Sequence, residues 1–354
     1  MQRNKMAETV DLANLRSMSC RLGRNPTLVQ GSGGNTSVKD GNIIWVKASG
    51  TWLAHAEKQN IMVPVDLTAI QQMIRSGKTN FNDARLHGTL HPSIETSLHC
   101  LFDHDVVVHV HSVNAIAWSV QIGAKKHLRE ILKQIDWRYI PYAKPGVSLA
   151  TKVANTLDRK TTKPSLLILE NHGLVIGGET CAAVESLLTN IELKLQIPER
   201  LTKKPNIRLL KSAIKNLPGW RLPVTTDIHK IAMDKESIDI VTTGALIPDH
   251  AVFLQNKVPV CESPDEISQT IGQYHSTFGV IPDWIIVPDA GVVLSEKMGA
   301  AAESQLLGLA MITLRIPSGS NVRFIGEHAA KDLRAWDAEK YRVELDAELS
   351  KTKY

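Results

Sequence analysis

Residues 103–112 of this chain read Asp-His-Asp-Val-Val-Val-His-Val-His-Ser. The centre of this stretch is rich in β-branched residues and follows a polar turn, so we expect a strand from Val106 to Ser112. Side chains on a strand alternate between its two faces, and His109 and His111 therefore project from the same face. Two imidazoles at this spacing are close enough to bind one metal ion, but the pair alone does not establish a metal site.

Helical and extended patterns alternate on both sides of this segment. Apolar residues at helical spacing predict helices over 10–22, 67–75, 93–102, 115–122, 127–134, 147–157 and 181–195. Apolar runs predict extended segments over 42–48, 61–65 and 165–170, and the glycine-rich segment 31–37 is expected to be a turn. The helix over 93–102 is expected to be capped by Ser93, with Glu95 in its first turn. Such alternation is typical of an α/β or an α+β protein with a mixed sheet, and we expect the α/β class here.

The length of 354 residues fits two domains. Lysines, arginines and prolines accumulate over 196–223, as in a solvated connector, so we expect one domain over 1–205 and a C-terminal α/β domain over 206–354. Residues 168–188 and 286–306 share eight identities in 21 aligned positions. This similarity favours a degenerate half-repeat in the C-terminal domain.

The composition limits the classes of function. The chain is 43% hydrophobic and 22% charged, and it contains no apolar run long enough to span a bilayer. Its net charge of +5 can attract phosphorylated substrates but is too small to indicate nucleic-acid binding. The four cysteines are widely spaced and no apolar signal segment opens the chain, so a cytoplasmic protein with reduced thiols and no membrane contact is expected.

A third histidine and a carboxylate extend the candidate metal site. His172, in Glu170-Asn171-His172-Gly173, ends another expected strand, where a histidine beside glycine can point into a cleft. Glu95 adds a carboxylate on the helix over 93–102, and His99 lies four residues further along, where it could orient Glu95. Three imidazoles, with or without a carboxylate, are typical of a catalytic zinc site that leaves positions open for substrate. The second copy of the half-repeat has Ala290 in place of His172, so we expect it to lack the metal ligand.

Five short motifs in this order resemble the class II aldolase/adducin family. They are Gly34-Asn35-Thr36-Ser37, Lys47-Ala48-Ser49-Gly50, Pro92-Ser93-Ile94-Glu95, His109-Val110-His111 and Asn171-His172-Gly173. The resemblance covers about residues 11–195. The residues of these motifs are most similar to those of the branch with rhamnulose-phosphate aldolase domains. The resemblance implies a three-layer fold with a central mixed sheet, one Zn²⁺ per chain, a small sugar phosphate as substrate and a homo-oligomer, with a tetramer favoured.

The resemblance also implies a role for each candidate residue. The zinc ligands would be His109, His111 and His172, the acid/base would be Glu95, and the phosphate would be held by Asn35, Ser49, Gly50 and Ser93. Ile94 stands where simple aldolases have a second serine, which removes one phosphate donor. Tyr142 stands where those aldolases carry a tyrosine that serves the active site, there of the adjacent subunit.

The implied reaction is a reversible cleavage of a ketose 1-phosphate to dihydroxyacetone phosphate and an aldehyde, through an enediolate. Two other enzymes fit the same residues: a sugar-phosphate 4-epimerase, which re-adds the aldehyde by its other face, and a dehydratase. A non-catalytic adducin-like interaction module is the alternative from another class, and such a module need not retain the metal ligands.

Overall fold

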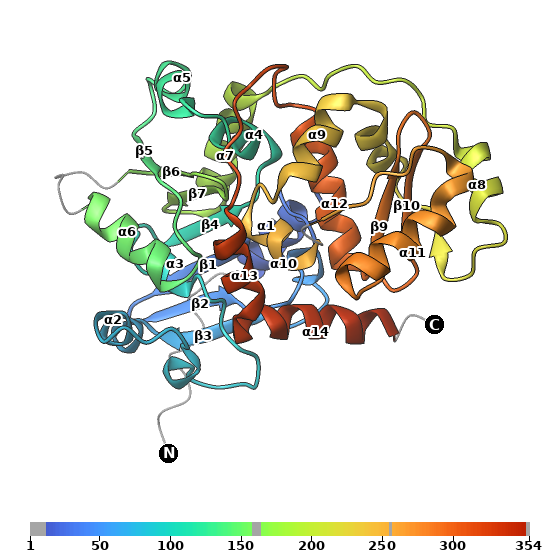
Figure 1. Cartoon of the computed structure of the whole chain (residues 1–354). Coiled ribbons are helices and arrows are strands. Elements are labelled where there is room, and N and C mark those ends of the chain that lie inside the picture. The colour runs from blue at the N-terminus through green and yellow to red at the C-terminus, as the bar shows by residue number, and fades with distance from the viewer. Residues whose placement is uncertain (1–11, 158–163, 255–256, 352–354) are drawn as a thin grey trace. The chain divides into compact units, whose positions relative to one another are not determined.

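The computed structural model describes residues 12–157, 164–254 and 257–351. The chain divides into two compact units (Figure 1). The first comprises the chain up to Ser119 together with Gly123–Gln196, and the second comprises Val120–Ile122 and the chain from Ile197 onward.

A seven-stranded mixed sheet forms the centre of the first unit. Its strands lie in the order β3-β2-β1-β4-β7-β6-β5, and every neighbouring pair is antiparallel except the parallel pair β5 and β6. The strands are β1 (Asn35–Asp40), β2 (Ile43–Lys47), β3 (Met62–Asp66), β4 (Val106–Val110), β5 (Trp137–Ile140), β6 (Leu166–Leu169) and β7 (Gly173–Gly178).

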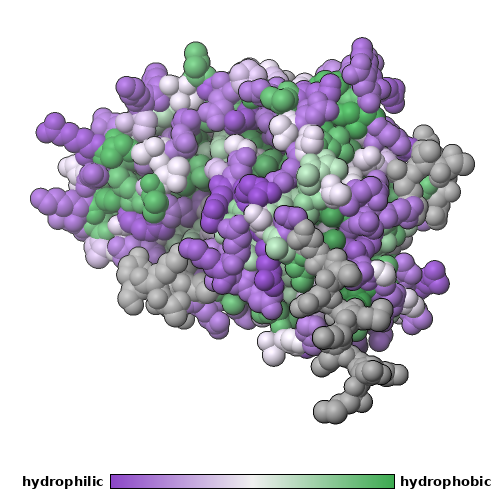
Figure 2. All heavy atoms as spheres, turned by 180° about the vertical axis from the view of Figure 1, so that it is seen from behind, coloured by the Kyte–Doolittle hydropathy of each residue, from purple (hydrophilic) through white to green (hydrophobic). Residues whose placement is uncertain are grey.

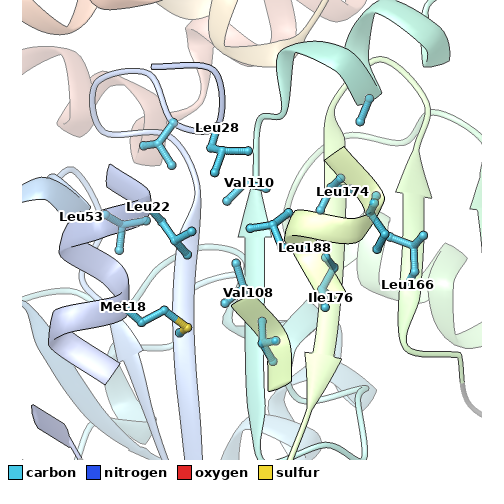
Figure 3. Packing of buried hydrophobic residues seen from close by; sticks show 14 of the residues in the cluster. Met18, Leu22, Leu28, Leu53, Val108, Val110, Leu166, Leu174, Ile176 and Leu188 are labelled. Carbon is cyan, nitrogen blue, oxygen red and sulfur yellow. The ribbon is translucent and has the colours of Figure 1, made fainter. Parts of the chain in front are cut away.

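Helices cover both faces of this sheet and complete a three-layer α/β fold. They are α1 (Leu12–Gly23), α2 (Leu67–Arg75), α3 (Thr96–His99), α4 (Val113–Ser119), α5 (Ala124–Ile131), α6 (Val147–Leu157) and α7 (Cys181–Leu195), with short 3₁₀ turns η1 (Leu53–His55) and η2 (Asn82–Ala84). Residues of α1 and α7 pack with Val108 and Val110 of β4 on one face (Figure 3). Residues of α3 and α6 pack with Val107 on the opposite face. The prediction of an α/β fold with a central mixed sheet is confirmed.

Two local expectations were wrong near the candidate site. The helix predicted over 93–102 is only the single turn α3, and Ser93 does not cap it. Instead, the Ser93 amide donates to the Lys47 carbonyl at 3.1 Å, which holds this segment extended beside the end of β2. The expected turn over 31–37 already becomes strand β1 at Asn35, because pairing with both β2 and β4 outweighs the low strand propensity of its polar residues.

The second unit has a small antiparallel sheet of its own. Its strands lie in the order β8-β10-β9, with β8 (Trp220–Arg221), β9 (Trp284–Val287) and β10 (Gly291–Ser295). The segment Val120–Ile122 belongs to this unit because the Arg323 amide donates to the Val120 carbonyl at 2.7 Å. Its helices are α8 (Ile207–Ile214), α9 (Lys235–Thr243), α10 (Pro248–Phe253), α11 (Ile267–Phe278), α12 (Ala300–Thr313), α13 (Glu327–Ala335) and α14 (Asp337–Lys351), with 3₁₀ turns η3 (Thr226–Met233) and η4 (Pro264–Glu266).

The turn between β9 and β10 repeats the backbone of the turn between β6 and β7. Asn171 and Asp289 both have positive φ, at 53° and 56°. The glycines two residues later, Gly173 and Gly291, have φ of 155° and 144° and pair with the last residue of the preceding strand in each case. A long helix follows each hairpin, so the sequence similarity between the two segments coincides with the same strand–turn–strand–helix geometry.

The surface carries polar side chains between smaller apolar groups, as the face seen in Figure 2 shows. Among the described residues, no helix combines the length and the apolar character needed to cross a membrane.

Candidate active site

Three buried histidines converge at one end of β4. His109 lies in β4, His111 follows the end of that strand, and His172 lies in the turn between β6 and β7. One ring nitrogen from each histidine lies within 4.8 Å of the other two. The ring centroids are 4.8 to 5.2 Å apart. The first unit therefore brings together three imidazoles that are far apart in sequence, in an arrangement that suits one metal ion.

Glu95, the residue before α3, lies against this cluster. Its Oε2 atom is 3.3 Å from His109 Nε2, and its Oε1 atom is 3.4 Å from His172 Nε2. In the described part of the chain, neither Glu95 Oε1 nor His109 Nε2 has a hydrogen-bond partner, although both atoms are buried. The carboxylate and the imidazole are thus close together without a hydrogen bond between them.

The second ring nitrogen of His109 explains this arrangement. His109 Nδ1 lies 2.9 Å from the Leu174 carbonyl oxygen, which can only accept, so Nδ1 carries the proton. In the neutral ring Nε2 then presents a lone pair, and this lone pair lies beside the negatively charged carboxylate of Glu95. Two buried acceptor atoms in contact are unfavourable unless a proton or a metal ion supplies positive charge between them. The donor set therefore fits a divalent metal held by His109, His111 and His172.

Glu95 is held in its ionised form. Its burial favours the neutral acid, but the positive charge that the neighbouring histidines, His109 first, carry when protonated, together with the amide of Asn35, outweighs that effect and lowers its pKa to about 2. A carboxylate that stays charged above this pH can accept a proton during a reaction.

Gly173 allows the turn that carries His172 to approach β4. Its φ is 155°, and a Cβ atom at this position would lie 2.3 Å from the Val110 carbonyl oxygen, well inside van der Waals contact. The neighbouring Asn171 adopts a left-handed φ of 53°, which a polar side chain tolerates better than a β-branched one.

We expect Gly173→Ala to push the turn away from β4 and to displace His172 from the cluster. The variant should lose about 2–4 kcal/mol of unfolding free energy through backbone strain and overpacking, and most of its metal affinity. Denaturant unfolding and zinc titration measure the two effects. Gly41→Ala is the matched control, since Gly41 also has positive φ (55°) but a Cβ atom there would meet no other atom within 4 Å. Equal metal binding by both variants would contradict the role of the close approach.

Two of the residues expected to bind phosphate, Asn35 and Ser93, lie next to Glu95. Ser93 Oγ accepts from the Asn35 side-chain amide at 3.4 Å and from the Glu95 backbone amide at 3.2 Å. Ser49 follows the bridge between Ala48 and Pro92, and its amide donates to the His91 carbonyl at 2.8 Å. Gly50 follows with a φ of 73°. Their role in phosphate binding stays a prediction.

Lys47 is a residue of this region that the sequence did not single out as functional. Its side chain is buried, and its Nζ atom donates to the Ser32 carbonyl at 2.9 Å and to the Thr51 carbonyl at 2.7 Å. It joins the loop before Asn35 to the loop that contains Ser49. The sequence feature that could have indicated Lys47 is its position at the end of an otherwise apolar strand.

Tyr142 is not hydrogen-bonded to the histidine cluster. Its hydroxyl is buried and has no hydrogen-bond partner among the described residues, and burial raises its pKa to about 12. Glu170 holds the segment, because Glu170 Oε2 accepts from the Tyr142 amide at 2.9 Å while Oε1 accepts from the Tyr139 hydroxyl at 3.0 Å. Its role in the site of an adjacent subunit stays a prediction.

Comparisons with known proteins place these residues in one domain. Residues 17–197, about half of the chain, match the family model described as the class II aldolase and adducin N-terminal domain. An L-fuculose phosphate aldolase of Methanococcus maripaludis strain S2 is 28% identical over 166 residues, which are 45% of this chain and 81% of that protein. The enzyme of the same name from Methanococcus vannielii is 28% identical over 198 residues, 53% of this chain and 92% of the relative.

Solved structures also resemble the first unit. The N-terminal class II aldolase domain of a conserved protein from Thermoplasma acidophilum has a TM-score of 0.47 and 23% identity, covering 55% of this chain and 98% of that one. An L-fuculose 1-phosphate aldolase has a TM-score of 0.42 and 19% identity, covering 55% of this chain and 86% of the other.

Proposed function

The chain belongs to the class II aldolase and adducin family, and we propose that it is a zinc-dependent aldolase that cleaves a ketose 1-phosphate to dihydroxyacetone phosphate and an aldehyde through an enediolate. The observation that carries this proposal is the buried cluster of His109, His111 and His172, with the carboxylate of Glu95 in contact with it. A non-catalytic interaction module has no need to bury a carboxylate against three imidazoles.

His109, His111 and His172 would hold the zinc ion. When bound, the metal supplies a Lewis acid that polarises the substrate carbonyl and its neighbouring hydroxyl. Glu95, ionised and next to this position, moves a proton to and from the carbon beside the carbonyl. Tyr142 keeps its proton until high pH, so it can donate a hydrogen bond to the oxygen of the leaving aldehyde if the segment approaches a site.

The phosphate would be bound by Ser49, Gly50 and Ser93, with Asn35 beside Ser93 at the edge of this site. The Ser93 hydroxyl accepts two hydrogen bonds, which leaves its own proton available for a phosphate oxygen. Lys47 supports this region with a buried positive charge and with its two carbonyl contacts.

We expect Ser49→Ala to raise KM for a phosphorylated ketose about tenfold, because one hydrogen bond to a charged group contributes about 1.5 kcal/mol. The value of kcat should change little, since Ser49 lies away from the reacting carbons. Steady-state kinetics with a ketose and its 1-phosphate measure the effect. Thr68→Ala, at the start of α2 in the same unit, is the control. A KM that stays at the wild-type value would remove Ser49 from the phosphate site.

The function is tested by incubating zinc-loaded protein with a panel of ketose 1-phosphates and measuring dihydroxyacetone phosphate release with a coupled assay. Release from at least one of them supports the aldolase. Interconversion of two pentulose 5-phosphates without net cleavage would favour the 4-epimerase, and loss of water would favour the dehydratase. Inactivity on all of these substrates, together with failure to take up zinc, would favour the interaction module.

We also propose that residues 1–205 form the catalytic domain and residues 206–354 a degenerate half-repeat. The identical turn backbone at Asn171 and Asp289 supports this proposal. Ala290 occupies the position of His172, so the copy would lack the metal ligand. The assembly is proposed to be a homo-oligomer, with a tetramer favoured, and analytical ultracentrifugation measures it.

A further inference from the structure

We infer that His99 is a positioning residue that fixes the orientation of Glu95 through the side-chain amide of Asn35. The inference rests on the proposed role of Glu95 as the acid/base. It concerns a chain of three hydrogen bonds, from Ser37 to His99, from His99 to Asn35 and from Asn35 to Glu95.

The sheet places the two outer partners of His99 on one face. Asn35 and Ser37 are two residues apart in β1, so their side chains point to the same side of the sheet. Asn35 is the register partner of His109 in β4, which brings this face to the histidine cluster. His99 ends helix α3 on the same side and is completely buried.

Both ring nitrogens of His99 are used. Nδ1 lies 2.7 Å from Ser37 Oγ, and Nε2 contacts the side-chain oxygen of Asn35. The amide oxygen can only accept, so Nε2 carries the proton, and Nδ1 then accepts from the Ser37 hydroxyl. Burial first, and the nearby His109 second, lower the pKa of His99 to about 3, which keeps the ring neutral with one donor and one acceptor.

Contacts on both sides determine which way the Asn35 amide faces. The carboxylate of Glu95 can only accept, so the Asn35 nitrogen donates to Oε2 at 2.9 Å, and the matching N–H of His99 on the Asn35 oxygen holds the amide in this direction. Glu95 itself receives no other hydrogen bond on Oε1 within the described residues, and its side chain makes no capping contact with α3. The Asn35 amide is therefore the group that fixes the rotation of the carboxylate beside the metal ligands.

The test compares His99→Gln with His99→Leu. The Gln side chain can place an N–H donor where Nε2 lies, whereas Leu fills the space without any donor. We expect His99→Leu to lower kcat for aldol cleavage about 10- to 100-fold, the scale of a small misplacement of a catalytic group. His99→Gln should restore kcat to within about threefold of the wild type. Zinc content and KM should stay at wild-type values in both variants.

Crystal structures of the same proteins give a readout that does not depend on activity. The Asn35 amide and the Glu95 carboxylate should keep their orientation in wild type and in His99→Gln, and should rotate in His99→Leu. Equal kcat for the Leu variant and wild type, a Gln variant as poor as Leu, or a loss confined to KM or zinc content would overturn the inference. Wild-type protein that shows the hydrogen-bond chain but cleaves no ketose 1-phosphate would instead contradict the proposed function. If His99→Leu fails to fold, Ser37→Ala replaces it, with a smaller fall in kcat expected because His99 loses the donor that fixes its tautomer.

Discussion

His109→Ala is expected to abolish metal binding and aldolase activity together. The variant removes one of three imidazole ligands and the Nδ1 contact to the Leu174 carbonyl. The binding free energy of structural zinc in proteins is roughly 10–16 kcal/mol and is shared among the ligands. Removal of one ligand should therefore weaken zinc binding about a hundredfold or more. Activity falls at least as far, because the remaining site can no longer polarise the substrate.

Metal analysis of purified protein measures this result directly. Wild type should hold about one zinc per chain, and His109→Ala should hold almost none after dialysis against a weak chelator. His87→Ala is the control, because His87 is exposed in the same unit and belongs to no metal cluster in the described residues. Removal of zinc from wild type should reproduce the inactivity of the variant, and added zinc should restore wild type alone. Full zinc content in His109→Ala would show that the metal site lies elsewhere.

The strand pattern made part of this site predictable from sequence. The period of two along β4 places His109 and His111 together, and the glycine after His172 marks a turn at a strand end. The convergence of His172 with the other two was not derivable from spacing, because it depends on β7 pairing with β4 and not with another strand. Only the family resemblance predicted that His172 lies beside His109 and His111.

The supporting residues were harder to predict, because their roles depend on individual hydrogen bonds. The role of Asn35 in phosphate binding stays a prediction, and the contacts that its amide nitrogen makes with Glu95 and its oxygen with His99 could not be derived from its place in the sequence. His99 was expected to orient Glu95 directly, but its ring contacts Ser37 and Asn35. Strand β1 was not predicted for the same reason. Its polar residues belong to a buried hydrogen-bond network, which the periodicity of the sequence does not indicate.

Glu95→Gln is expected to stop the reaction while leaving the metal in place. The amide has the size of the carboxylate but cannot accept a proton, so kcat should fall about 10²- to 10⁴-fold, the range of general acid–base catalysis. Its oxygen can still accept from Asn35, which keeps the side chain oriented. Its NH₂ group would then lie near His172 Nε2, where it competes weakly with a cation, so we expect zinc affinity to fall less than about tenfold.

Exchange of dihydroxyacetone phosphate protons with deuterated water, followed by NMR, isolates the step that Glu95 performs. Wild type should exchange one proton stereospecifically without any aldehyde present, and Glu95→Gln should exchange it at least a hundredfold more slowly. Glu95 Oε2 lies 3.3 Å from His109 Nε2, so Glu95 is close enough to act either as a metal ligand or as the acid/base. The metal content of the same samples distinguishes these two roles. Zinc retained with exchange lost identifies Glu95 as the proton carrier. Zinc and exchange lost together would make Glu95 a metal ligand, and normal exchange would place the acid/base on another side chain.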